Sequence, residues 1–184
     1  MFTLRLIVLV LGTILIVWVS RSSFRDIQNH GFYRFFAWEI ILILFALNMK
    51  YWIIDPFSLR QMIAWTLLII SLVLIFQGVK LFRNKGGVDQ ERQDPALVSI
   101  EKTTELVTSG IYAYIRHPFY ASLLFLTWGI FFKHLTWIAF FLGILSSIFL
   151  ILTAKKEEVE NIAFFGERYQ EYIQTTRMFI PLIF

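Results

Sequence analysis

The chain has 184 residues, of which 58% are hydrophobic, 18% aromatic and 16% charged. This composition excludes a soluble globular domain, because such domains are only about half apolar and about one quarter charged. The chain contains no cysteine, which excludes disulfides, thiolate metal sites and a cysteine nucleophile. Its three histidines are widely separated and have no metal-ligand spacing. We expect a lipid bilayer around the chain, and neither a metal nor a nucleic acid as partner.

Long apolar stretches lie, in chain order, at about residues 2–20, 35–54, 62–82 and 135–153. Each is close to the roughly 20 residues that a membrane-spanning helix needs. A shorter apolar run at about residues 119–132 has about 14 residues, which on length alone also suits a re-entrant or buried helix. We interpret it as a fifth span that pairs with the last stretch. The predicted fold is therefore an all-α integral membrane protein with about five transmembrane helices and a C-terminal helical hairpin.

A single domain over residues 1–184 is expected, since the chain contains no internal repeat and no sign of a second core. Its expected parts are three transmembrane helices within residues 1–83, a polar connection at 84–118, the helical hairpin at 119–153 and a C-terminal segment at 154–184. The connection changes sharply in composition and has turn residues at both ends, which indicates a loop rather than a domain boundary.

Basic residues are distributed unevenly about the five predicted crossings, and the formal net charge is +4. Of the 17 Lys and Arg residues, alternating crossings place only Arg5, Lys50, Arg60 and Lys133 on the side of the N-terminus. The others share the side of the polar connection and of the C-terminus. Because positive residues mark the cytoplasmic side, we expect the N-terminus outside, and the connection and the C-terminus in the cytosol.

A polar run from Gly110 to Tyr120 interrupts the apolar pattern and contains Arg116-His117-Pro118. Proline lacks an N–H and disfavours helical geometry in the residue before it, so His117 is expected at a break just before a helix begins. The free N–H groups of a helix start, together with Arg116, His117 and Tyr120, suit a carboxylate. Alternatively, Arg116 is a topology charge, Pro118 only starts the helix, and the tyrosines form an interfacial belt.

Two carboxylates, Glu157 and Glu158, directly follow an apolar helix and a pair of lysines. At this depth a carboxylate is expected to be half-buried, and suited to bind an ammonium or sulfonium group or to act as a base. The alternative is a solvated face on which Lys156 and Glu160 form a surface pair worth about 0.2–0.5 kcal/mol.

A third motif, Phe165-Gly-Glu-Arg-Tyr-Gln-Glu-Tyr172, follows the two clusters. Taken in order, the run from Glu105 to Tyr120, the Glu157-Glu158 pair and this third motif resemble the isoprenylcysteine carboxyl methyltransferase family. That family lies within a wider superfamily of membrane methyltransferases that includes phospholipid methyltransferases. The resemblance extends over about residues 104–181, and three ordered motifs are more specific than any one of them.

The resemblance implies a methyltransferase that uses S-adenosylmethionine, leaves S-adenosylhomocysteine as product and acts on a lipophilic acceptor. It implies that Arg116 and Glu157 are catalytic and that the cofactor pocket faces the cytosol. The cofactor-binding residues that it implies are Thr104, Glu105, Leu106, Val107, Tyr112, His117, Pro118, Phe119, Tyr120, Glu157 and Glu158.

One position departs from the pattern of the carboxyl methyltransferases. They have an arginine four residues before the position of Glu157, where it engages the substrate carboxylate, and this chain has Thr153. The acceptor is therefore either an isoprenylcysteine-like carboxylate or another lipid or small hydrophobic molecule. Two other interpretations remain: an NADPH-dependent membrane reductase of the sterol reductase type, whose C-terminal region is similar, and a non-catalytic membrane partner protein.

Overall fold

The computed structural model describes residues 2–85 and 105–181, and their regular secondary structure is helical. The α-helices are α1 (Phe2–Ser20), α2 (His30–Asn48), α3 (Leu59–Lys85), α4 (Pro118–Lys133), α5 (Trp137–Phe165) and α6 (Glu167–Thr175). Short 3-10 helices are η1 (Ser23–Arg25), η2 (Met49–Tyr51) and η3 (Gly110–Ala113). The predicted all-α fold is therefore confirmed.

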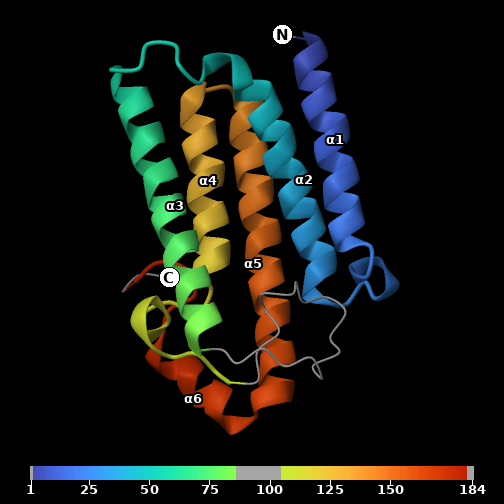
Figure 1. The fold of residues 1–184 in the computed structure, drawn as a ribbon, viewed down its shortest axis with the longest axis vertical. Helices are drawn as coiled ribbons and strands as arrows, with labels where there is room; N and C mark the ends of the chain where they lie inside the picture. Colours follow the sequence, from blue (N-terminus) through green and yellow to red (C-terminus); the bar gives the residue numbers. More distant parts are fainter. Residues whose placement is uncertain (1, 86–104, 182–184) are drawn as a thin grey trace.

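The first five α-helices run alternately up and down one bundle, and α6 lies across its lower end (Figure 1). We call this end the α6 end, and the opposite end, where the N-terminus lies, the far end. Helices α1, α2, α3 and α5 are long and apolar enough to cross a membrane, so the chain is a multi-pass membrane protein. Helix α4 has 16 residues, or about 24 Å, and is thus shorter than the roughly 30 Å of bilayer hydrocarbon.

The helices agree with the predicted stretches, with two differences that matter for the site. Helix α2 begins at His30 rather than near residue 35, because the Asn29 side chain caps it by accepting a backbone hydrogen bond of 2.7 Å. Helix α5 continues past residue 153 to Phe165, since the lysine, glutamate and alanine residues that follow favour a helix. The predicted carboxylate pair therefore lies on a helix, with a fixed direction for each side chain.

The centre of the bundle is formed by α2, α4 and α5, and α1 packs at the edge against α2. Small side chains let the central helices approach closely, because Ala37 of α2, Ala121 of α4 and Ala154 of α5 belong to one buried cluster. The other members of this cluster, which we call the central layer, are Ile115, Tyr120, Leu150 and Phe179. Many hydrophobic side chains of α1 are exposed, as expected for a helix surrounded by lipid.

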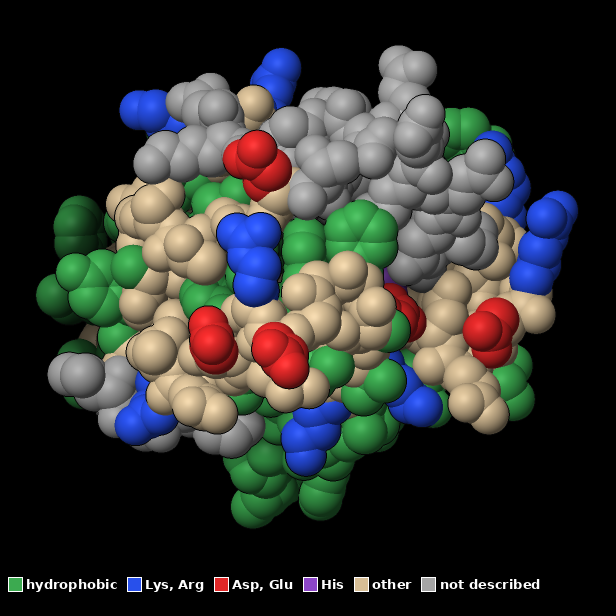
Figure 2. Space-filling model, turned by 90° about the horizontal axis from the view of Figure 1, so that it is seen from below, with side chains coloured by type: hydrophobic (Ala, Val, Ile, Leu, Met, Phe, Trp, Pro, Cys, Tyr) green, Lys and Arg blue, Asp and Glu red, His purple; other side chains and the backbone are tan. Residues whose placement is uncertain are grey.

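The surface at the α6 end is polar. Figure 2 looks onto this end and shows basic and acidic side chains across it, with hydrophobic side chains prominent at its margin. Exposed basic residues of the segments that meet here are Arg21, Arg25, Lys80, Arg83, Lys155, Arg168 and Arg177. The two sequence clusters thus lie at the end of the bundle where charge is concentrated.

A buried lysine lies at the far end. Lys133, the last residue of α4, is fully buried, and its ammonium lies 3.3 Å from the centre of the Trp65 ring and 5.2 Å from that of Trp52. It donates a 3.0 Å hydrogen bond to the side chain of Gln61, whose amide donates in turn to the Tyr51 carbonyl at 2.7 Å. Two indole faces and an amide dipole therefore stabilise the charge. A residue that the sequence presents as a topology charge is thus part of the packed interior.

Replacing Gln61 with leucine is expected to destabilise the protein by roughly 3 kcal/mol, because buried polar partners, among them the Lys133 ammonium, lose their hydrogen bonds. Gln77→Leu is the matched control, since Gln77 lies on the same helix with an exposed side chain. Thermal unfolding in detergent should show a lower midpoint for Gln61→Leu only. Equal midpoints for the two variants would contradict a stabilising role of this cluster.

Candidate functional site

The predicted break before α4 is present, and hydrogen bonds hold its backbone. His117 is the N-cap of α4, with φ −121° and ψ 64°, and Pro118 begins the helix. The C-terminal segment runs parallel to this stretch: the Arg116 N–H donates to the Arg177 carbonyl at 2.8 Å, and the His117 N–H to the Met178 carbonyl at 3.2 Å. The prediction that Pro118 places His117 at a break is therefore confirmed.

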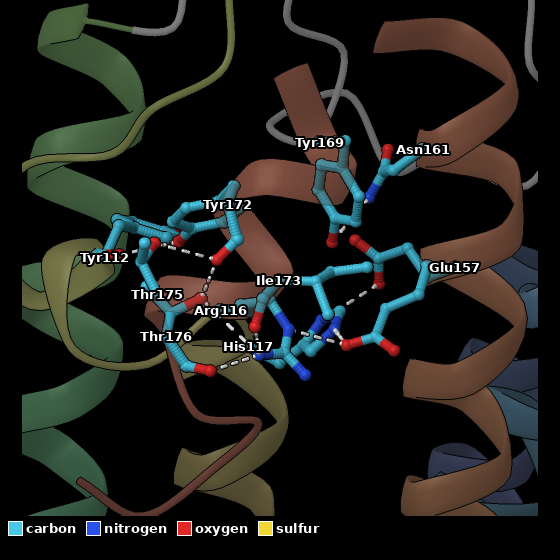
Figure 3. A network of polar contacts seen from close by, with 11 residues as sticks. Tyr112, Arg116, His117, Glu157, Asn161, Tyr169, Tyr172, Ile173, Thr175 and Thr176 are labelled. Carbon is cyan, nitrogen blue, oxygen red and sulfur yellow. Dashed lines mark hydrogen bonds and ion pairs between the residues drawn. The ribbon is translucent and has the colours of Figure 1, made fainter. Parts of the chain in front are cut away.

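The Arg116 side chain ties the start of α4 to α5 and α6 (Figure 3). Its Nε donates to Glu158 Oε1 at 2.7 Å, and its Nη1 donates to the carbonyls of Thr176 at 2.5 Å and Ile173 at 3.2 Å. Both carbonyls lie at the C-terminal end of α6, where carbonyls lack partners within the helix. Because only 8% of its side chain is exposed, Arg116 acts as a buried cross-link.

His117 lies between the two predicted carboxylates. Its Nε2 is 3.3 Å from Glu158 Oε1, its Nδ1 is 3.8 Å from Glu157 Oε2, and its ring stacks on Tyr120 with 5.5 Å between centroids. The His117 side chain is 3% exposed, whereas that of Glu157 is 19% exposed. A carboxylate accepts up to about four hydrogen bonds, so Glu157 retains capacity to bind a further cationic group. The structure thus brings together the clusters that the sequence separates by forty residues.

A second wall of the site comes from α2, which no sequence motif indicated. Glu160, one turn beyond Glu157 on α5, accepts a hydrogen bond from the His30 N–H at 2.9 Å and contacts the His30 ring Nδ1. Glu160 therefore pairs with His30 of α2. It does not form the surface pair with Lys156 that a solvated face would provide. Arg34, one turn along α2 from His30, is 2% exposed and interacts electrostatically with Glu157. The signal in the sequence is a histidine and an arginine four residues apart at the start of an apolar helix.

Two tyrosines of α6 cover the site from the α6 end (Figure 3). The Tyr172 hydroxyl donates to the Tyr112 carbonyl at 2.6 Å, and the Tyr169 hydroxyl accepts from the Asn161 side chain at 3.4 Å. Burial is the main cause that raises the pKa of Tyr169 and of Tyr172 above the usual range. Gly166 connects α5 to α6 with a φ of +63°, a left-handed conformation that favours glycine. The third motif contains Gly166, Tyr169 and Tyr172, although the sequence alone assigned none of these three residues to the site.

Tyr172→Phe is expected to lower the stability at pH 8 by about 1 kcal/mol, through the loss of one buried hydrogen bond. A tyrosine whose pKa is higher in the folded than in the unfolded protein stabilises the fold below the unfolded pKa, about 10, and this contribution is lost as the pH rises above that value. The variant should therefore show a shallower fall of the unfolding midpoint between about pH 9 and 11. Thermal unfolding across this range checks the prediction, and an unchanged slope would contradict it.

The other predicted cofactor residues lie on the approach to α4. Along the chain that leads to η3, Glu105 is exposed, Leu106 half-buried and Val107 buried, and Thr104 lies outside the described residues. Tyr112, in η3, is buried and accepts the hydrogen bond from α6 through its carbonyl. Phe119 packs against α3 near Gly78. Its side chain is therefore directed at a different helix from His117, which faces α5.

Fold and site together define a multi-pass helical membrane protein with a half-buried polar cluster at one end of its bundle. Residues 95–164 match the sequence model of the isoprenylcysteine carboxyl methyltransferase (ICMT) family. The matched segment includes His117, Tyr120 and Glu157, so the resemblance predicted from the motifs is confirmed over this segment. No curated protein and no solved structure matches the chain.

Proposed function

We propose that the protein is an integral-membrane methyltransferase that uses S-adenosylmethionine and methylates a lipophilic acceptor. The observation that carries this proposal is the partly exposed Glu157 carboxylate beside His117 and Tyr120, where α4 begins and the apolar part of α5 ends. A carboxylate, an imidazole and an aromatic face together suit a ligand that carries an ammonium, a carboxylate and a sulfonium. The match of residues 95–164 to the ICMT family supports the same activity.

The side chains at the site fit this cofactor. Glu157 would bind its ammonium group, His117 and Tyr120 its carboxylate, and the backbone of residues 105–107 the edge of its adenine. When bound, S-adenosylmethionine supplies a methyl group that its sulfonium charge activates. The Arg116 guanidinium is already engaged by Glu158 and by the end of α6. We therefore assign Arg116 a positioning role: it holds the neighbouring His117 and α6 in place.

Catalysis by this site would rest on alignment. Methyl transfer is an in-line displacement, so holding the nucleophile and the methyl group in line matters more than proton transfer. His117 is suited to this task because hydrogen bonds fix its backbone, and Tyr120 and Phe179 pack on its ring. The tyrosines of α6 would limit the access of water from the cytosol, while an acceptor dissolved in the bilayer would enter from the side of the bundle.

The charge of the site favours S-adenosylmethionine over NADPH. Helix α5 directs Glu157, Glu158 and Glu160 toward His117 and His30, over little more than one turn. The 2′-phosphate of NADPH requires a basic pocket, whereas a cluster of carboxylates favours a cationic ligand. We therefore retain the methyltransferase as the better-supported of the two enzyme classes.

The proposal includes an orientation in the membrane. The exposed basic side chains gather at the α6 end, and positive residues mark the cytoplasmic side of membrane proteins. We place the α6 end and the site in the cytosol, where S-adenosylmethionine is available, and the N-terminus outside. Labelling of single cysteines introduced at Arg168 and at Phe57, both exposed, should detect opposite sides of the membrane.

Transfer of a tritiated methyl group from S-adenosylmethionine tests the activity itself. The purified protein is incubated with a lipid extract, and the label in the organic phase is counted. We expect label with the wild type and with Glu167→Gln, a control at an exposed residue of α6, but not with Glu157→Gln. A wild type that neither transfers label nor binds S-adenosylhomocysteine would contradict the proposal.

A further inference from the structure

A groove follows the outer face of α3 toward the α6 end of the bundle. Its apolar part is a hollow of about 680 Å³, lined by exposed side chains of α3 that include Ile69, Leu72, Val73 and Phe76. At Gln77 this hollow meets a second one, of about 400 Å³, which Gln77 also lines together with Lys80. From Ile69 to Lys80 the helix rises about 16 Å, which is roughly half of the 30 Å of bilayer hydrocarbon. The groove therefore has the depth of one lipid leaflet.

The groove becomes polar where α3 leaves the apolar region. The apolar stretch of α3 is Leu59–Leu81, so Lys80 lies in its last turn. Tyr114, which follows η3, lines the second hollow opposite α3 in the sequence and also lines a third hollow, of about 430 Å³, together with Arg177. The groove thus leads from an apolar helix face to an end that carries two basic side chains.

The fold holds this polar end in shape. Gly110 has a φ of +63°, and a Cβ atom there would lie 2.5 Å from the side chain of Leu81, so glycine lets η3 lie close against α3. The Arg177 N–H donates to the Tyr114 carbonyl at 3.0 Å, and the Arg177 carbonyl accepts from the Arg116 N–H at 2.8 Å. Backbone hydrogen bonds and packing on α3 therefore fix the segments that form this end.

The basic side chains at the polar end are not engaged by the fold. Lys80, Tyr114 and Arg177 are exposed, and within the part of the chain that the structure describes, none of these three side chains forms a hydrogen bond or an ion pair. Among the described residues that line the two polar hollows there is no Asp or Glu. A matching ligand therefore has an apolar part for the face of α3 and a negative charge for this end.

We infer that the groove binds an anionic phospholipid, with an acyl chain along α3 and the head group at the end that carries Lys80 and Arg177. Basic side chains at the membrane surface attract anionic lipids. Arginine binds a phosphate through paired hydrogen bonds, lysine adds a compact charge, and the Tyr114 hydroxyl is a further donor at this depth. The groove shares no residue with the set assigned to the cofactor, so the inference holds whichever reaction the protein catalyses.

Native mass spectrometry of the purified full-length protein in detergent tests this inference, because it counts bound lipids directly. The probes are dioleoylphosphatidylglycerol, which is anionic, and dioleoylphosphatidylcholine, which has the same chains and no net charge. We expect the wild type to bind one phosphatidylglycerol at least about tenfold more tightly than phosphatidylcholine. The double variant Lys80→Gln/Arg177→Gln should reduce this preference to less than about threefold. The control Arg25→Gln/Lys155→Gln, which removes two other exposed basic charges, should keep it.

Four results would overturn the inference. The first two are a wild type without the preference and a Lys80→Gln/Arg177→Gln variant that keeps it. The third is a control that loses as much preference as this variant, which would indicate a general effect of net charge. The fourth is displacement of the lipid by an equal concentration of sn-glycerol 3-phosphate, which would indicate a phosphate site that does not use the face of α3.

Single variants decide if the double variant does not fold. Lys80→Gln and Arg177→Gln should each lower the preference for phosphatidylglycerol about threefold, because each removes one of the two charges at the polar end. An unchanged preference in both single variants would overturn the inference.

Discussion

Glu157→Gln is expected to weaken the binding of S-adenosylhomocysteine about 10- to 100-fold. A hydrogen bond to a charged group contributes about 1.5–3 kcal/mol, and each 1.4 kcal/mol corresponds to a factor of ten in affinity. Glutamine keeps the size and shape of the side chain and removes only its charge. The change therefore tests whether the negative charge of Glu157 contributes to the binding of the ligand ammonium.

Calorimetric titration of the purified variants measures this effect. Glu167→Gln is the matched control, because it removes the same charge from an exposed position in the first turn of α6. Both variants should remain folded, because glutamine keeps the size of the side chain and an oxygen that can accept the hydrogen bond from Tyr120. Wild-type affinity in Glu157→Gln would show that this carboxylate does not hold the ammonium.

Arg116→Met is expected to have the largest effect on stability. Removing one partner of a buried ion pair costs about 3–5 kcal/mol, because the other charge is left buried and unpaired. Here the variant would also leave the carbonyls of Ile173 and Thr176, at the end of α6, without the guanidinium. At roughly 2–4 °C per kcal/mol for a chain of this length, the unfolding midpoint should fall by about 10 °C.

A double variant distinguishes a buried cross-link from a general loss of charge. Adding Glu158→Met to Arg116→Met removes the carboxylate that has lost its guanidinium, so the double variant should be less destabilised than Arg116→Met alone. Arg177→Met serves as the control, because Arg177 is exposed in the segment that runs beside Arg116. If the destabilisation of the double variant equals the sum of those of Arg116→Met and Glu158→Met, the two side chains do not interact, and the buried ion pair is contradicted.

The parts of this protein that depend on local chemistry could be predicted from the sequence. The length of the apolar stretches predicts the helices of the bundle, because the bilayer requires every backbone group to be satisfied within a helix. The break at His117 also follows from the sequence, since Pro118 itself disfavours a helical conformation before it. In both cases the residues that determine the local structure are neighbours in the sequence.

The α2 wall could not be predicted, because it depends on how distant helices align. The pairing of His30 with Glu160 joins residues 130 positions apart, and it follows from the alignment of α2 against α5. The same alignment buries Arg34, which by sequence is one of several topology charges, and lets it interact electrostatically with Glu157. The start of α2 was missed for a related reason: its first five residues include His30, Gly31 and Arg34, so a count of apolar residues places the helix start too late.

The neighbours of the C-terminal segment could not be predicted from the sequence either. From its sequence, Met178 to Phe184 is a short apolar end suited to the membrane interface. In the structure, Phe179 is 1% exposed and packs against His117, and the backbone beside it hydrogen-bonds to the break before α4. Apolar composition indicates that a segment is buried, but not which residues cover it. Only the tertiary structure reveals that this segment supports the site.

Calorimetric titration of the wild-type protein with S-adenosylhomocysteine tests the central claim most directly, because it requires no knowledge of the acceptor. We expect saturable binding of one ligand per chain, with competition by S-adenosylmethionine and none by NADPH. The affinity should fall in Glu157→Gln and remain in Glu167→Gln. Binding of NADPH in place of S-adenosylhomocysteine, or no saturable binding to a folded wild type, would contradict the assignment of this site to a methyltransferase.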